Sequence, residues 1–367
     1  MRNKAAFLKS PLSVLSILSI LLFVISVPVY LIAMGNPKLA DFLNSTVSHA
    51  LRTILGTLNR IFPFSLFELL IILALPLLVL LIYLGIKFGK NIWGRVRFIA
   101  VLLGVISLIA TSYIYTLGIG YHTTPLADKM EIENRSDISR EELIYTYLLV
   151  LDEVNHHAEL VQYEGAESRM PYSIGVLSDK LSLSYRNLAS SYSFLKTYTT
   201  RAKPVLFSTV MSDAGIMGIY SFFSGEPNVN VEYPDYTLPF TAAHEFAHAR
   251  GISRENEANF TAFLVCINSD DAYIRYSGYL NMYEYLSSAL YSLDKDTYLE
   301  LKDGLSDNAR LDLIASRRVS EEHKDTLIGK INNKLNDFYL KSNGTEGVVT
   351  YGYVVRLSVS YYIQMSQ

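Results

Sequence analysis

The chain has 367 residues, half of them hydrophobic, with a formal net charge of −3 and a single cysteine. This length exceeds one average domain, and the high hydrophobic share predicts membrane-spanning segments. The acidic balance argues against a nucleic-acid partner, and one cysteine excludes an intramolecular disulfide.

Three long apolar runs lie in the first third of the chain, at residues 12–34, 66–86 and 98–119. Each reaches the roughly 20 residues that a helix needs to cross a bilayer. A cleaved signal peptide is a competing interpretation of the first run, but the run is too long and lacks a small-x-small cleavage site. We therefore predict a membrane domain over residues 1–120, with three transmembrane helices in contact with lipid.

Basic residues gather before the first run and between the second and third. They are Arg2, Lys4, Lys9, Lys87, Lys90, Arg95 and Arg97. The positive-inside rule places both segments in the cytoplasm. Residues 98–367 instead hold 22 basic against 33 acidic residues, a net of −11. We predict a multi-pass protein of the cell membrane, with a cytoplasmic N-terminus and an extracytoplasmic domain over residues 121–367.

The segment between the first two runs, residues 36–64, has apolar residues at helical spacing with polar residues between them. These apolar residues are Leu43, Val47, Leu51, Ile54 and Leu58. The pattern predicts an amphipathic helix that rests on the outer membrane surface.

The remaining sequence is mainly helical in pattern. Ser139 and Glu142 form a capping box that starts one helix. Further helices are expected over residues 172–195, 271–293, 299–315 and 321–340, and two extended stretches over residues 204–208 and 229–233. Cys266 lies in an apolar run, which predicts a buried, inert thiol. The pattern predicts a mainly α fold with a small sheet.

The motif that carries chemistry is His244-Glu245-Phe246-Ala247-His248. Residues four apart share one face of a helix, so His244 and His248 can bind one metal ion. Glu245 then lies within reach of a metal-bound water and can accept its proton. This HExxH arrangement is typical of zinc peptidases, so Zn²⁺ is the expected cofactor.

A hydrolytic zinc site needs a third protein ligand beside its water. Arg254 stands where a metzincin has its third histidine, which excludes that class. The candidates are Glu255 and Glu257, just after Ser253, which can cap a new helix. Glu255 shares its expected helix face with small or polar residues that allow close approach to the HExxH helix. The pattern therefore favours Glu255, with Glu257 as the alternative.

Residues 254–259, Arg-Glu-Asn-Glu-Ala-Asn, resemble the R-E-x-x-A-D signature of the gluzincin membrane peptidases. These include the heat-shock membrane protease group, the prenyl-protein peptidases and the beta-lactam-sensor peptidases. The resemblance implies a zincin-like α+β domain in which Glu255 is the zinc ligand. Asn259 stands where those families have aspartate, and the six residues between His248 and Glu255 form a shorter link than theirs.

The chain is also similar to an uncharacterised bacterial membrane family that is known only as a domain of unknown function. The likeness rests on the three apolar runs, residues 218–230, the HExxH core, residues 255–260 and Tyr351-Gly352. It covers most of the chain, but it implies no substrate.

The predicted function is that of a membrane-anchored zinc peptidase acting on a peptide or protein. His244, His248 and Glu255 hold the metal, and Glu245 is the catalytic base. Two alternatives stay open: a catalytically inactive membrane sensor or assembly factor with the same fold, and a zinc site that serves only structure.

Two further groups are expected to serve the site. The oxyanion donor has four candidates, Tyr220, Tyr233, Arg250 and Tyr351, which the sequence does not rank. Residues 229–233 are expected to align a substrate by strand addition. His122 and the pair His156-His157 are expected to lie outside the metal site.

Overall fold

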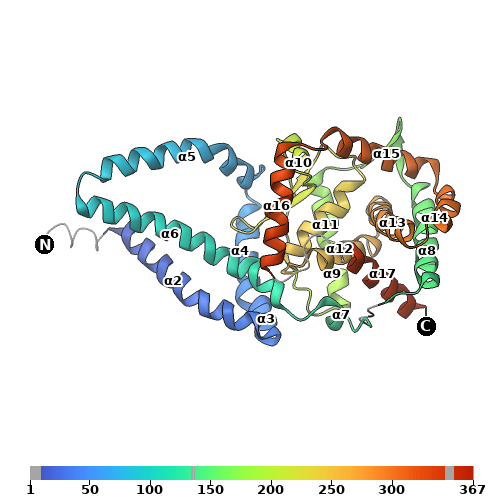
Figure 1. Cartoon of the computed structure of the whole chain (residues 1–367), viewed down its shortest axis with the longest axis horizontal. Coiled ribbons are helices and arrows are strands. Elements are labelled where there is room, and N and C mark those ends of the chain that lie inside the picture. Colours follow the sequence, from blue (N-terminus) through green and yellow to red (C-terminus); the bar gives the residue numbers. More distant parts are fainter. Residues whose placement is uncertain (1–9, 134, 136, 344–350, 367) are drawn as a thin grey trace.

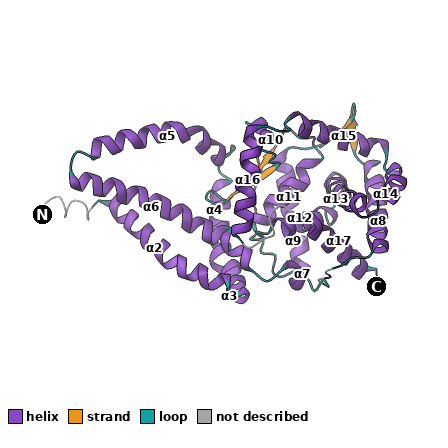
Figure 2. Ribbon diagram, viewed as in Figure 1, coloured by secondary structure: helices purple, strands orange, loops and turns teal. Residues whose placement is uncertain are grey.

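The computed structural model describes residues 10–133, 135, 137–343 and 351–366. Two parts lie end to end, a group of long apolar helices and a larger globular region (Figure 1). Helices dominate both parts, and the only strands of the described residues form two small sheets in the globular region (Figure 2). The predicted class, mainly α with three N-terminal apolar helices and a small sheet, is confirmed.

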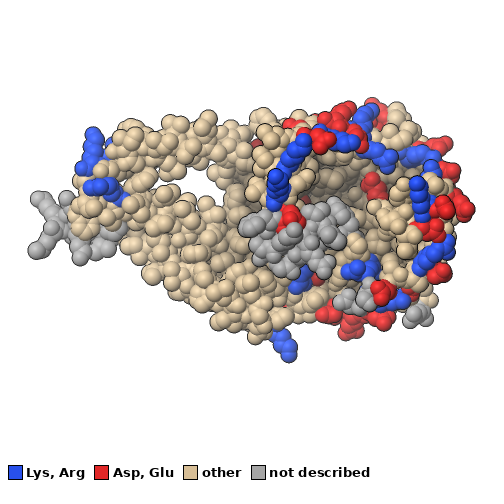
Figure 3. Space-filling view, in the orientation of Figure 1, with Lys and Arg blue, Asp and Glu red and all other residues tan. Residues whose placement is uncertain are grey.

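Three helices are long and apolar enough to cross a membrane: α2 (Pro11–Met34), α5 (Leu66–Phe88) and α6 (Ile92–Thr116). The third begins earlier than expected, because the Asn91 side chain caps it by accepting from the Gly94 N–H at 2.8 Å. α2 packs along α6, where a Cβ on Gly104 would lie 2.7 Å from the Ser16 Cα. On the viewed face the spans carry almost no charge beyond the basic link between α5 and α6 (Figure 3). These features make the chain a membrane protein.

The segment between α2 and α5 forms α3 (Pro37–Leu43), a π-helical turn η1 (Asn44–Ser48) and α4 (His49–Asn59). Helix is present as expected, with Ile54 and Leu58 exposed. Its polar face, however, packs on protein. Arg52 is 1% exposed and donates to the Asn44 carbonyl at 2.9 Å and to the Thr116 carbonyl at 3.4 Å. This segment therefore contacts both the end of α6 and the globular region.

The globular region is built from helices around a shared core. They are η2 (Gly118–His122), α7 (Leu126–Lys129), α8 (Arg140–Ala158), α9 (Ile174–Ser191), α10 (Ser208–Asp213), α11 (Thr237–Ala249), α12 (Glu255–Ile267), α13 (Ala272–Leu293), α14 (Lys295–Leu301), η3 (Lys302–Gly304), α15 (Asp307–Glu322), α16 (Leu327–Ser342) and α17 (Tyr351–Met365). The capping box at Ser139 is confirmed. The last predicted helices are divided differently, into α14, α15 and α16. α12 lies at the centre of the core, and its Cys266 is fully buried, which raises the pKa of the thiol.

One sheet is the hairpin of β1 (Gln162–Glu164) and β2 (Glu167–Arg169), and the other has three strands. Its order is β3 (Lys203–Val205), β5 (Glu226–Asn230) and β4 (Gly218–Ser221), with β5 parallel to β3 and antiparallel to β4. The expected strand addition at residues 229–233 is therefore wrong, because β5 is the central strand and both of its edges are already paired. The edge beside the HExxH helix belongs to β4.

Two buried carboxylates join the start of α5 to the globular region. Glu226 accepts from the backbone N–H groups of Leu66 and Phe67, each at 2.8 Å. Glu68 accepts from the N–H groups of Leu206 and Phe207, at 3.1 and 2.7 Å. Such charge-assisted bonds at a helix N-terminus are strong. They fix the β3–β5–β4 sheet, and with it the wall of the candidate site, to the end of a membrane span.

Candidate metal centre

The HExxH residues lie on α11, where the four-residue spacing turns both imidazoles to one side. The Nε2 atoms of His244 and His248 are 3.0 Å apart. The His248 Nδ1 lies 2.8 Å from the Ile252 carbonyl. When that nitrogen donates to the carbonyl, Nε2 keeps its lone pair for a metal, an orientation common among histidine ligands.

The turn after α11 depends on Gly251. Its φ of +91° is a conformation that side chains disfavour, and a Cβ there would lie 2.4 Å from Nη2 of Arg52. Asn44 also donates to the Gly251 carbonyl at 3.0 Å. This tight turn brings the start of α12 back beside the histidines.

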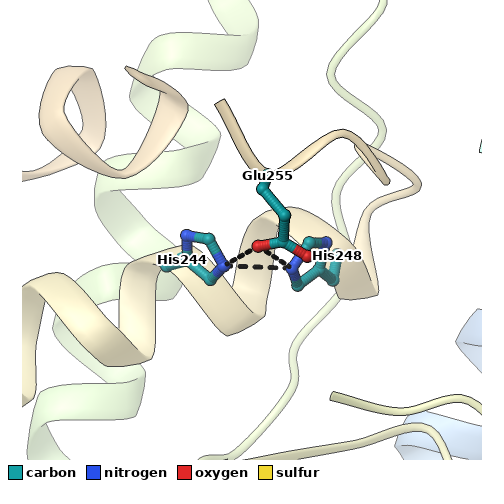
Figure 4. Close-up of side chains that lie close together, drawn as sticks. All are labelled: His244, His248 and Glu255. Atoms are coloured by element: carbon teal, nitrogen blue, oxygen red, sulfur yellow. Dashed lines mark hydrogen bonds and ion pairs between the residues drawn. The ribbon is translucent and has the colours of Figure 1, made fainter. Parts of the chain in front are cut away.

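Glu255 is the first residue of α12, and its carboxylate meets both imidazoles (Figure 4). The Oε2 atom is 3.1 Å from Nε2 of His244 and 3.6 Å from Nε2 of His248. Within the described part of the chain, this is the one group of three or more potential metal-ligating residues. Tetrahedral zinc with bonds of about 2.0–2.1 Å places its ligand atoms roughly 3.3–3.4 Å apart. The three donor atoms therefore fit Zn²⁺.

Glu257, the alternative ligand, points elsewhere. Its Oε1 accepts from the Leu126 N–H and from Nη1 of Arg254, both at 2.9 Å, and the residue is 4% exposed. Ser253 does not cap α12, because its hydroxyl donates to the Leu117 carbonyl and Arg254 takes the cap position. Of the two candidate carboxylates, the structure brings only that of Glu255 to the histidines.

Glu245 lies beside this group under the edge of β4. A Cβ on Gly218 would lie 2.5 Å from its Oε1, and its Oε2 has no hydrogen-bond partner in the described structure. Burial raises the pKa of Glu245 to about 7, although the nearby histidines favour the charged carboxylate. A buried carboxyl with a pKa near neutrality is suited to proton transfer.

The pKa values of His248 and Glu255 shift in opposite directions. Burial lowers the pKa of His248, but the Glu255 carboxylate outweighs it and raises that pKa to about 9. Burial raises the pKa of Glu255, yet His248 and His244 hold it well below its usual range. Without metal, the group is therefore a carboxylate–imidazolium pair.

A cleft of about 600 Å³ opens in front of these side chains. It is lined by the end of α6, the β4 edge and helices α11, α13 and α16. Sequence reasoning missed several lining residues: Tyr113, Tyr121, Asn281, Tyr285, Asn332, Asn333 and Asn336. The three asparagines of α16, Asn332, Asn333 and Asn336, were a usable signal, because asparagine is a poor helix former and they recur on one side of the helix. Figure 3 shows the globular region hollowed between α16 and α13.

The candidate oxyanion donors separate by position. Tyr220 lines the cleft, whereas Tyr233 does not and lies 3.4 Å from the Ser320 hydroxyl. Arg250 is 3% exposed and stacks 3.9 Å from the Tyr185 ring centroid, away from the cleft. The side chain of Tyr351 falls outside the described residues. Of the three candidates that the structure describes, only Tyr220 lines the cleft, and its hydroxyl is buried.

His122 and His157 have contacts of their own and are not part of the metal group. Nε2 of His122 lies 3.1 Å from the Tyr30 hydroxyl, and His157 stacks on Tyr279 at 5.4 Å between ring centroids.

Comparison with known families gives one match. Residues 41–359 match the family described as "Protein of unknown function (DUF3810)". The chain belongs to this family. The match confirms the similarity to an uncharacterised family, and it spans the sheet, the HExxH helix and the cleft. No curated protein and no solved structure matches the chain, so the likeness to gluzincin peptidases rests on residues 254–259 alone.

Proposed function

We propose that this protein is a membrane-anchored zinc peptidase of the gluzincin type. The observation that carries the proposal is the convergence of His244, His248 and Glu255 on one point of a cleft wall, with Glu245 beside them. Three protein ligands leave a fourth position for water, as catalytic zinc sites do.

The chemistry divides between the metal and the chain. Bound Zn²⁺ would polarise a peptide carbonyl and lower the pKa of a water in the fourth position. Glu245 takes the proton of that water and later gives it to the leaving amine. Its unpaired Oε2 is free to receive the proton, and the absence of a side chain on Gly218 leaves room for the carboxylate.

The substrate we propose is a peptide in extended conformation. Gly218, Ile219 and Tyr220 of β4 line the cleft, and β4 is an edge strand of its sheet. Edge strands bind extended peptides through backbone hydrogen bonds. In this proposal the substrate is aligned by β4 and not, as the sequence predicted, by residues 229–233.

The number of ligands favours catalysis over a purely structural zinc. Structural sites are normally closed by four protein ligands, and the described residues supply three. An inactive sensor would keep the metal but lack turnover, so peptide cleavage separates it from an enzyme.

We further propose that the cleft lies outside the cytoplasm. The basic residues before α2 and between α5 and α6 favour a cytoplasmic location for these segments. A reporter fused to the C-terminus is expected to be active only in the extracytoplasmic space. Cytoplasmic reporter activity would reverse the topology.

The test of activity uses the full chain in detergent, with zinc content measured by elemental analysis and cleavage by a peptide library. The parent is expected to hold about one zinc and to cleave peptides. Glu245→Gln keeps the metal, because the amide is nearly isosteric, but loses on the order of 10²–10⁴ in rate. His244→Ala loses both metal and activity, and the exposed Glu300→Gln is the matched control. A glutamine variant as fast as the parent, or a zinc-loaded parent that cleaves nothing in the library, would contradict the proposal.

A further inference from the structure

Helix α16 has a polar side that lines the cleft and an apolar side that is exposed. Asn332 and Asn336 line the cleft, while Ile328, Ile331 and Leu335 lie on another side, 44%, 51% and 62% exposed. These apolar residues follow helical spacing and form a continuous stripe. Such a stripe on the surface of a globular region normally marks a contact with lipid or protein.

A second exposed apolar group lies around α10. Leu206, Phe207 and Val210 are 82%, 56% and 52% exposed. The Glu68 carboxylate, one turn into α5, accepts the N–H groups of both Leu206 and Phe207. These two side chains are therefore held at the end of a helix that crosses the membrane.

The two groups are joined and lie at the same end of the globular region. The Asn332 side chain donates to the Ala214 carbonyl at 3.0 Å, directly after α10. Figure 1 shows α16 running across the direction of the spans, at the edge of the globular region nearest to them. Tyr30 and Tyr113, near the ends of α2 and α6, mark the same level, since tyrosine is enriched where a helix leaves the bilayer.

The occupant of this surface follows from its continuity with the spans. The exposed apolar side of α5 begins next to the exposed residues before α10, because Glu68 accepts from Leu206 and Phe207, and α16 is joined to the end of α10 through Asn332. A helix that lies in this plane with an apolar stripe is the geometry of an interfacial helix. Lys330 and Lys334, both exposed on α16, can extend to lipid headgroups.

We propose that the apolar faces of α10 and α16 lie in the interfacial layer of the leaflet next to the globular region, so that one wall of the cleft is anchored at the membrane surface. The segment from Gly215 to Gly218, which follows α10, and the asparagines of α16 both belong to that wall. The proposal depends only on the three spans and does not require peptidase activity.

The test measures lipid contact at single positions of the full chain in phosphatidylcholine vesicles. Leu206→Cys and Leu335→Cys are each labelled with a bimane fluorophore and quenched by doxyl-labelled phosphatidylcholine. The control is Leu293→Cys, a leucine nearly as exposed as Leu335 (57% against 62%), at the end of α13 beside α14, at the far end of the molecule. Cys266 is fully buried, so the unaltered chain reports background labelling.

We expect doxyl lipid to quench the labels at 206 and 335 at least twofold more than the label at 293, and aqueous iodide to show the reverse order. Equal lipid quenching at all three positions would overturn the proposal. Protection of 206 and 335 from both quenchers would also overturn it, because a protein neighbour would then cover this surface.

Discussion

Substitution of the two glutamates near the start of α12 should have different effects. Loss of Glu255 should remove a metal ligand, whereas loss of Glu257 should remove a structural carboxylate. Glu255→Gln replaces the carboxylate at the histidines with a neutral amide, a poor zinc ligand. Loss of a partner that only orients a ligand costs about 10–100-fold in metal affinity, so loss of the ligand itself should cost more. In the metal-free protein this variant also loses the ion pair between Glu255 and the His248 imidazolium, so it too is expected to unfold somewhat earlier, and zinc binding is the readout that separates the two variants.

Glu257→Gln should do the reverse. The glutamine oxygen can still accept from Leu126 and Arg254, but the bond from the Leu126 N–H becomes neutral and the ion pair with the Arg254 guanidinium is lost. A hydrogen bond to a charged group contributes about 1.5–3 kcal/mol and a neutral one about 0.5–1.5, so the Leu126 bond loses roughly 1 kcal/mol, and the lost ion pair with Arg254 adds up to about 1 kcal/mol. For a chain of this size, a loss of about 2 kcal/mol lowers the melting temperature by about 2–3 °C.

The assay combines zinc titration with thermal unfolding in detergent, where unfolding is followed in excess chelator so that metal does not contribute. The expected result is a Glu255→Gln variant that does not bind zinc, and a Glu257→Gln variant that binds zinc but unfolds earlier than the parent. If Glu257→Gln loses the metal and Glu255→Gln keeps it, the assignment of the third ligand is refuted.

Three further predictions concern the site. Gly218→Ala places a Cβ 2.5 Å from Oε1 of Glu245, so it should lower the cleavage rate by about tenfold or more while zinc is retained. The control is Gly35→Ala, whose Cβ would lie 4.0 Å from its nearest neighbour, and it should change neither the cleavage rate nor the zinc content. The pKa of His248 is raised to about 9, and zinc binds only the neutral imidazole. Zinc affinity measured by chelator competition should therefore fall about tenfold per pH unit as the pH drops below 9. A zinc affinity that stays level between pH 9 and 7 would contradict this. If both proposals hold, a peptide tethered to a vesicle should be cleaved fastest when the scissile bond lies near the bilayer; rates independent of tether length would argue against a cleft at the membrane surface.

The sequence by itself determined the three spans and the presence of a HExxH helix. Both follow from local pattern, because a run of about 20 apolar residues can satisfy its backbone in lipid only as a helix. The four-residue spacing likewise aligns His244 and His248 on any helix. The preference for Glu255 came from the residues on its expected helix face and from the likeness at residues 254–259.

Only the tertiary structure decided the surroundings of that helix. The segment between the first two spans was expected on the membrane surface, yet Arg52 is buried beside Gly251, where its guanidinium donates to the carbonyls of Asn44 and Thr116. Residues 229–230 proved to belong to a central strand, since sheet order depends on which strands pair and not on local sequence. The cleft wall of α16 was equally hidden, because 84 residues separate Asn332 from His248 and only packing brings them to one cleft.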